Sequence, residues 1–262
     1  MMKTSISDSL ISLCPKSLRL PLMFYYYGWS GRLEDELLYL EKLIQQKKLV
    51  NHGKRAIDIG ANYGFYSYLL SRFFSVVEAF EPESGCFEMV NAYSQDKSGI
   101  NVHNVALSNF DGSLELHTPI VQGKRFTGLS SFSKPEEECT STTVPVKKLD
   151  EYKFDNVSLI KIDVEGYESE VIEGGRETIL REKPNILVEI EQRHLRGKQI
   201  ESVFEQIISL GYQGNFLYQE TLVPLSDFVY EKHQKPFEDD INRHKYDNLK
   251  SYVNNFLFQP QS

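Results

Sequence analysis

The chain has 262 residues, of which 40% are hydrophobic and 25% are charged, and its net charge is −8. This length and composition suit one globular domain with short additions and a full hydrophobic core. The acidic balance excludes a general attraction for nucleic acid or for an anionic membrane surface.

The spacing of the cysteines and the length of the apolar runs exclude further classes of protein. Cys14, Cys86 and Cys139 are widely spaced, and an odd number without a C-x-x-C pair argues against a disulfide framework or a zinc site. No run approaches the ~20 apolar residues that a membrane span needs, and the features of a signal peptide are missing. We therefore expect a cytoplasmic protein with no membrane span and no nucleic-acid partner.

The first 50 residues are predicted to form a leader and one helix. Residues 1–30 read as an irregular leader with an aromatic cluster, Phe24-Tyr-Tyr-Tyr-Gly-Trp29. This cluster either packs on the domain surface, which we favour, or covers a pocket or a dimer contact. Residues 32–50 read as a helix, because Leu33, Leu37, Leu40 and Ile44 recur at helical spacing.

Strands and helices then alternate over residues 51–229, which we take as the main domain. Strands are predicted at 55–60, 75–81, 100–107, 157–163 and 185–191, and helices at 63–74, 84–94, 168–181 and 198–210. This alternation is typical of βαβ units, so it predicts a doubly wound α/β fold with a parallel sheet and helices on both faces.

Three segments depart from the alternation. Residues 108–150 contain two extra predicted strands, 112–117 and 142–148, joined by a polar loop with Gly128, Ser130 and Ser131 that could wall an acceptor site. Residues 215–218 and 221–224 are predicted to form a hairpin at the sheet edge. Residues 230–262 are expected to form a C-terminal tail that packs on the domain.

A ligand loop is predicted where the first strand ends at Asp58 and Gly60, Asn62 and Gly64 lead into a helix. Ligands of open α/β sheets bind beyond the carboxyl ends of the strands. A dinucleotide site would require G-x-G-x-x-G to receive a pyrophosphate, whereas this loop has G-x-N-x-G after a carboxylate. S-adenosylmethionine (SAM) has no phosphate: Asp58 can attract its ammonium group, through water or backbone, and the loop amides can take its carboxylate.

The next two strand ends supply the rest of the predicted cofactor site. Glu81 follows the second strand, about 20 residues after Gly60, where a carboxylate can accept both ribose hydroxyls of an adenosine. This spacing is common to SAM and NAD, so only the first loop distinguishes them. Ala106, near the end of the third strand, is expected to border the adenine.

The segment Leu159-Ile-Lys-Ile-Asp-Val-Glu-Gly-Tyr-Glu168 resembles the K-I-D-V-E-G-x-E signature of the FkbM family of methyltransferases. Matching pieces lie at 79–82, 106–112, 128–131, 149–150, 184–191 and 254–258, and the resemblance is strong over about 50–195. It implies a Rossmann-like class I SAM methyltransferase fold with a mostly parallel seven-stranded sheet. It also implies methyl transfer mostly to hydroxyl oxygens, often on glycan sugars or natural products.

A hydroxyl acceptor needs a general base close to the methyl group, and three residues are candidates. Asp163 ends the fourth strand beside the expected methyl position, so it is also expected to contact the cofactor, or else to bond the loop. Glu165 follows on the same loop. His194 titrates near pH ~6.5 when unperturbed, although it can equally be an exposed histidine. Lys161 is expected to pair with a carboxylate and hold the loop.

Alternatives remain open at this point. Asp163, Glu165, Glu189 and Glu191 are hard oxygen ligands that could bind Mg²⁺, which we do not favour, and no metal ligand set is assigned. An N-methyltransferase, an NAD-dependent oxidoreductase and a SAM-binding module without turnover are the competing functions. The expected partner is a small-molecule or saccharide acceptor, and the protein is expected to be a monomer or a homodimer.

Overall fold

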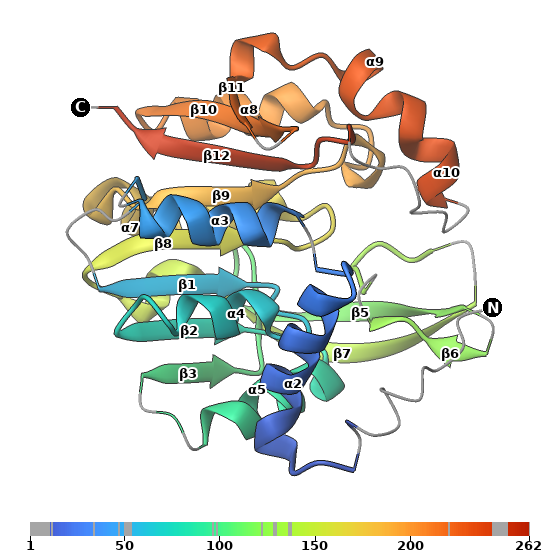
Figure 1. Cartoon of the computed structure of the whole chain (residues 1–262). Helices are drawn as coiled ribbons and strands as arrows, with labels where there is room; N and C mark the ends of the chain where they lie inside the picture. The colour runs from blue at the N-terminus through green and yellow to red at the C-terminus, as the bar shows by residue number, and fades with distance from the viewer. Residues whose placement is uncertain are drawn as a thin grey trace.

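The computed structural model describes residues 11–261, apart from 12, 34, 47, 50–53, 96, 98, 122, 128–129, 136–137, 220 and 243–250. Its centre is an eight-stranded sheet in the order β11-β10-β12-β9-β8-β1-β2-β3 (Figure 1). The strands are β1 (Arg55–Ile59), β2 (Val76–Phe80), β3 (Ile100–His103), β8 (Val157–Ile162), β9 (Asn185–Glu189), β10 (Tyr212–Tyr218), β11 (Thr221–Pro224) and β12 (Asn255–Pro260).

The middle of the sheet is parallel. Strands β3, β2, β1, β8 and β9 run in the same direction, and every residue of β8 is buried, as expected for a strand covered on both faces. β12 is antiparallel to β9 and β10, and β11 is antiparallel to β10. The predicted hairpin at the sheet edge is confirmed, and through β11 it extends the predicted seven-stranded sheet to eight strands.

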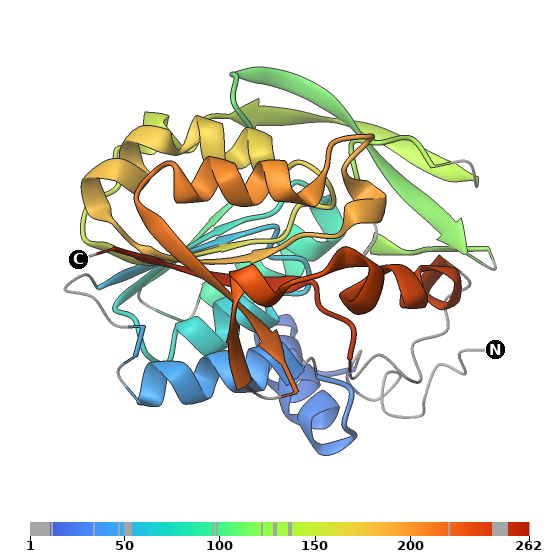
Figure 2. The same cartoon turned by 90° about the horizontal axis from the view of Figure 1, so that it is seen from above.

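Helices cover both faces of the sheet, which confirms the doubly wound fold (Figure 2). One face carries α2 (Lys16–Trp29), α3 (Asp35–Gln45), α4 (Phe65–Leu70) and α5 (Ser84–Ser94). The other carries α6 (Glu168–Gly174), α7 (Arg176–Glu182) and α8 (Ile200–Ile208). Alternate residues of each strand enter opposite cores: Ile57 and Ile160 pack under α6–α8, and Ala56 and Leu159 pack under α2–α4.

The segment after the third strand forms a second sheet beyond the carboxyl ends of β1, β2 and β8 (Figure 1). Its strands are β4 (Ala106–Leu107), β5 (Gly112–Val121), β6 (Lys124–Arg125) and β7 (Cys139–Lys147), in the order β4-β7-β5-β6. The single strand predicted at 100–107 is therefore divided, with β3 in the main sheet and β4 in the second sheet. The two extra strands predicted here are present, and both are longer than predicted. β5 and β7 pair antiparallel from Gly112–Val146 to Pro119–Cys139.

The C-terminal residues complete the main sheet. After η4 (Leu225–Asp227), α9 (Tyr230–His233), η5 (Lys235–Phe237) and α10 (Glu238–Asn242), β12 lies between β9 and β10. Phe256 and Phe258 enter one core and Leu257 the other. The end of the predicted tail is thus an internal strand, because its apolar residues alternate between two covered faces.

Two helix predictions differ from the structure. The leader is not irregular: residues 16–29 form α2, because Leu20 and Phe24, one turn apart, are both buried against the domain. The helix predicted at 168–181 is divided into α6 and α7 at Gly174 and Gly175. A Cβ at Gly174 would overlap the carbonyl oxygen of Ser108, so the chain passes too closely there for any other residue. Within the described part of the chain, no helix is both long and apolar enough to cross a membrane.

Candidate functional site

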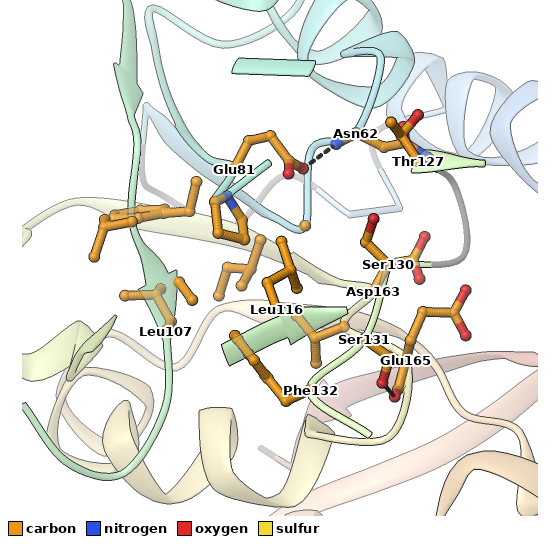
Figure 3. A pocket seen from close by; sticks show the side chains of 17 residues that line it. Asn62, Glu81, Leu107, Leu116, Thr127, Ser130, Ser131, Phe132, Asp163 and Glu165 are labelled. Atoms are coloured by element: carbon orange, nitrogen blue, oxygen red, sulfur yellow. Dashed lines mark hydrogen bonds between the residues drawn. The ribbon is translucent and has the colours of Figure 1, made fainter. Parts of the chain in front are cut away.

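An open cavity lies at the carboxyl ends of β1, β2 and β8, under the second sheet. Its empty volume is about 630 Å³, including the part open to solvent. Its wall is apolar on one side, with Leu107, Leu116 and Phe132, and polar on the other, with Ser130, Asp163 and Glu165 (Figure 3). A ligand with one apolar end and one charged end matches this division.

The loop after β1 borders the cavity through Gly60 and Asn62. Gly60 has a φ of +79°, and a Cβ there would overlap the carbonyl oxygen of Asp163. The glycine is therefore required by the close approach of the end of β8, whereas the sequence argument attributed it to a ligand. The amides of Gly60 and Ala61 both donate to the carbonyl of Phe80 at 3.0 Å, so these two amides already have acceptors.

Glu81 is held rigidly at the cavity wall. Its Oε2 accepts from the backbone amide of Asn62 at 2.6 Å, and its Oε1 accepts from the amide of Glu83 at 2.7 Å. Burial raises the pKa of Glu81 to about 7; the two amides oppose this rise, and the nearby carboxylates of Glu83 and Asp58 add to it. Each oxygen keeps a lone pair for a ligand hydroxyl, as the ribose prediction requires.

Asp58 and Gly64 lie behind the loop and are not part of the cavity wall. The Asp58 carboxylate is buried and accepts from the hydroxyl of Ser67 on α4 at 2.5 Å. Gly64 has a φ of +86°, and a Cβ there would lie 2.7 Å from Val90 and 3.1 Å from Leu20. Both residues contact helices that pack against the loop, so they hold the loop in place from the side away from the cavity.

The loop after β8 brings Asp163 and Glu165 to the cavity. Lys161 is fully buried, with its Nζ 3.8 Å from Asp163 Oδ2 and 3.8 Å from Glu189 Oε2. The predicted pairing of Lys161 with a carboxylate is present, and it joins the ends of β8 and β9. Glu168, the first residue of α6, fixes the same loop, since its Oε1 accepts from the amide of Gly166 at 2.8 Å.

Glu165 forms an ion pair with His194, which lies on η3 (Gln192–His194). Burial of the ring lowers the pKa of His194 by favouring the neutral form. The charge of Glu165 and the hydrogen bond to it together outweigh burial, so the pKa of His194 is raised. The hydroxyl of Ser131 donates to the backbone carbonyl of Glu165 at 2.9 Å. Glu165 lines the cavity and His194 does not. Two of the three predicted catalytic residues therefore form one ion pair, in which only Glu165 reaches the cavity.

The predicted acidic cluster is divided into ion pairs. Glu191 accepts from Arg193 at 2.6 Å and from the hydroxyl of Tyr252, while Glu189 lies near Lys161. Among the described residues, the ligand atoms of Glu165, Glu191 and His194 come within 4.8 Å of one another. Two donors that bind one ion at about 2.0–2.6 Å lie about 3–5 Å apart, so these three groups are close enough to share an ion. They are joined here by the ion pairs of His194 with Glu165 and of Arg193 with Glu191, and metal binding stays a prediction.

The sequence predicted some residues of the cavity wall and missed others. The predicted acceptor-wall residues Ser130 and Ser131 do line the cavity, while Gly128 lies outside the described residues. Leu116, Thr127 and Phe132 were not predicted, because their place depends on how the second sheet folds over the first. The predicted adenine neighbour, Ala106, is in the wall together with Val105 and Leu107.

Comparison with known proteins supports the same architecture. A model of the Methyltransferase FkbM domain matches residues 58–218, more than half of the chain. The crystal structure of Methyltransferase FkbM from Methylobacillus flagellatus KT aligns with a TM-score of 0.52 and 15% identity over 96% of this chain. This chain spans only 57% of that longer one.

A second similar structure is an O-methyltransferase from Bacillus cereus in complex with SAH, with a TM-score of 0.48 and 11% identity. The alignment covers 97% of this chain and 93% of that one. No curated protein matches the sequence. The fold is that of the class I SAM methyltransferases, as predicted.

Proposed function

The chain belongs to the FkbM family of methyltransferases, and from this premise we propose that it transfers a methyl group from SAM to a hydroxyl oxygen of a saccharide or a natural-product-type small molecule. The observation that carries the proposal is the divided cavity. Its apolar wall suits an adenine, Glu81 suits a ribose, and the carboxylates of Asp163 and Glu165 line the polar side, which suits the ammonium end of SAM and a hydroxylated acceptor.

The residues present fit the cofactor in three places. Glu81, oriented by the amides of Asn62 and Glu83, accepts the ribose hydroxyls. Leu107 and Leu116 pack against the adenine. The carboxylate of Asp163 borders the same cavity and offers a direct partner for the ammonium group, while the buried Asp58 can act on that group only through the loop backbone or water.

SAM supplies an electrophilic methyl group on a sulfonium, so the protein has to position the acceptor and remove its proton. Glu165 is the proton acceptor in this proposal, because its side chain reaches the cavity. His194 is its positioning partner: the ion pair fixes the carboxylate, and the hydroxyl of Ser131 fixes the backbone of the same residue. A fixed carboxylate at the acceptor's hydroxyl is the arrangement that general-base catalysis needs.

The first test is a calorimetric titration of the full chain with S-adenosylhomocysteine, with NAD in parallel. Micromolar binding of S-adenosylhomocysteine without binding of NAD is the expected result, and a screen of glycans and hydroxylated metabolites for methyl transfer from labelled SAM follows. Binding of NAD instead, or of neither compound, would remove the proposal. Cofactor binding with no transfer to any hydroxylated acceptor would favour a binding module or an amine acceptor.

Cofactor binding should depend on pH through Glu81. Only the ionised carboxylate can accept both ribose hydroxyls, because protonation turns one of its oxygens into a donor. Since its pKa is raised to about 7, the form that accepts both is scarce at pH ~6 and dominant at pH ~8. The Kd for S-adenosylhomocysteine should therefore fall about tenfold between these pH values. Glu81→Gln, a variant with no titrating group at this position, should bind weakly with a flat profile; an unchanged slope in this variant would assign the pH effect to another group.

A further inference from the structure

Helix α2 (Lys16–Trp29) exposes an apolar stripe on the outer surface of the molecule. Leu18, Leu22, Tyr25 and Trp29 are 52%, 41%, 60% and 86% exposed, and their spacing of four, three and four residues places them on one face of the helix. With Leu13, they make up five of the twelve large apolar side chains that are exposed among the described residues. Such a concentration is typical of an interaction surface.

The opposite face of α2 is already used. Leu20 and Phe24 are buried in the domain core, and the ring of Phe24 contacts Phe65 and Tyr68 of α4. No charged residue occurs from residue 20 to 31. A helix that is apolar on both faces is normally buried on both. Among the residues that the structure describes, the outer stripe has no partner like the one on its inner face.

A second copy of this chain fits the stripe better than a lipid surface does. Helices that lie on membranes rely on basic residues around the apolar face to attract anionic lipids. Here the two basic residues of α2 have protein partners, since Lys16 lies 3.7 Å from Glu88 and Arg19 donates to the carbonyl of Cys14. The net charge of −8 also repels an anionic membrane.

The spacing of the stripe is self-complementary. The order Leu18–Leu22–Tyr25–Trp29 has the same intervals in both chain directions. A two-fold axis between residues 22 and 25 therefore sets Leu22 opposite the partner's Tyr25, and Leu18 opposite the partner's Trp29. Each level joins a leucine to an aromatic ring, and the contact is isologous, as closed dimers require. Antiparallel α2 helices also bring opposite dipole ends together.

We propose that α2 is the dimer contact of this protein, formed by antiparallel packing of the Leu18–Leu22–Tyr25–Trp29 stripes of two copies. Tyr25 and Trp29 together expose on the order of 300 Å², taking about 150–250 Å² per aromatic side chain, and the leucines extend this area. A standard interface buries about 800 Å² per partner, so the stripe supplies the apolar centre of a modest interface. We expect a dimer that dissociates on dilution within the micromolar range.

The first experiment is sedimentation of the full chain over about 1–100 μM, with two matched variants. Leu22→Asp places a carboxylate beside the two-fold axis and should leave a monomer throughout this range. Leu180→Asp, on α7 of the other face and 37% exposed against 41% for Leu22, should dimerise like the parent chain. A monomeric parent chain, or an equal effect of the two variants, would overturn the proposal.

A cross-linking experiment tests the geometry in a Cys14→Ser background. Leu18→Cys and Trp29→Cys chains are oxidised separately and as a mixture. Two copies of either position lie about 16 Å apart along the antiparallel helices, beyond the reach of a disulfide, so only the mixture should give a linked dimer. Linkage within one variant alone, or no linkage in the mixture, would contradict this arrangement.

Two other occupants of the stripe are distinguished by further measurements. If residues 1–10 cover it, the full chain is monomeric and a chain lacking them dimerises. If lipid covers it, the chain is monomeric and binds vesicles of phosphatidylcholine with phosphatidylglycerol, and Leu22→Asp abolishes that binding. Either result overturns the dimer.

Discussion

Replacing Glu165 by Gln is expected to lower kcat for a hydroxylated acceptor by about 10²–10⁴-fold, which is the range for loss of a general base. The Gln side chain has a similar size but cannot take a proton. The binding of S-adenosylhomocysteine should change little, because the cofactor is held mainly by Glu81 and the apolar wall. Initial rates and calorimetry on the same preparation separate the two effects.

His194→Gln is the companion variant. The charge of Glu165 and its hydrogen bond raise the pKa of His194 above its ordinary value, so the ring keeps its charge, and its ion pair with Glu165, to a higher pH than a free histidine would. As the pH rises through that pKa, the parent chain should lose the ion pair, whereas the variant has none to lose. The variant should therefore show a lower kcat with an altered pH profile and a similar KM. If Glu165→Gln kept the parent kcat, the base would be elsewhere, with Asp163→Asn as the next variant, or the acceptor would be an amine.

Gly60→Ala is expected to destabilise the fold by about 3 kcal/mol or more and to abolish cofactor binding. The new methyl group would overlap the carbonyl oxygen of Asp163, and the φ of +79° is unfavourable for alanine. The end of β8 must move away from the loop after β1, so the cavity wall formed by both segments is lost. Thermal unfolding should show a Tm lower by about 6–12 °C, given the size of the chain.

Gly197→Ala is the matched control for this variant. Gly197 also has a left-handed φ, +82°, but a Cβ there has no heavy atom within 4 Å. It should show only the cost of the backbone conformation, about 1–2 kcal/mol, and bind S-adenosylhomocysteine as the parent does. Equal Tm losses in the two variants, or normal cofactor binding by Gly60→Ala, would show that the contact with Asp163 is not what the glycine serves.

The sequence alone was sufficient for the central strands and for the family. β1, β2, β8 and β9 lie within two residues of their predicted bounds, and α5 matches its prediction. The four strands are short, apolar and mostly buried, so local composition predicts them. The motif segments at residues 58–64 and 159–168 also lie each within one strand–loop unit, and their positions at the carboxyl ends of parallel strands follow from the topology.

Only the tertiary structure decided which motif residues reach the cavity. Asp58 and Gly64 turned inward to Ser67, Val90 and Leu20, while Glu165 was joined to His194, which follows a different strand. The second sheet supplied Leu116 and Phe132, and the C-terminal residues became an internal strand. The physical reason is the same in each case. These contacts join segments that are far apart in the chain, and they form only when the layers of the fold pack together. Spacing along the sequence indicates only which residues share a strand, a turn or a helix face.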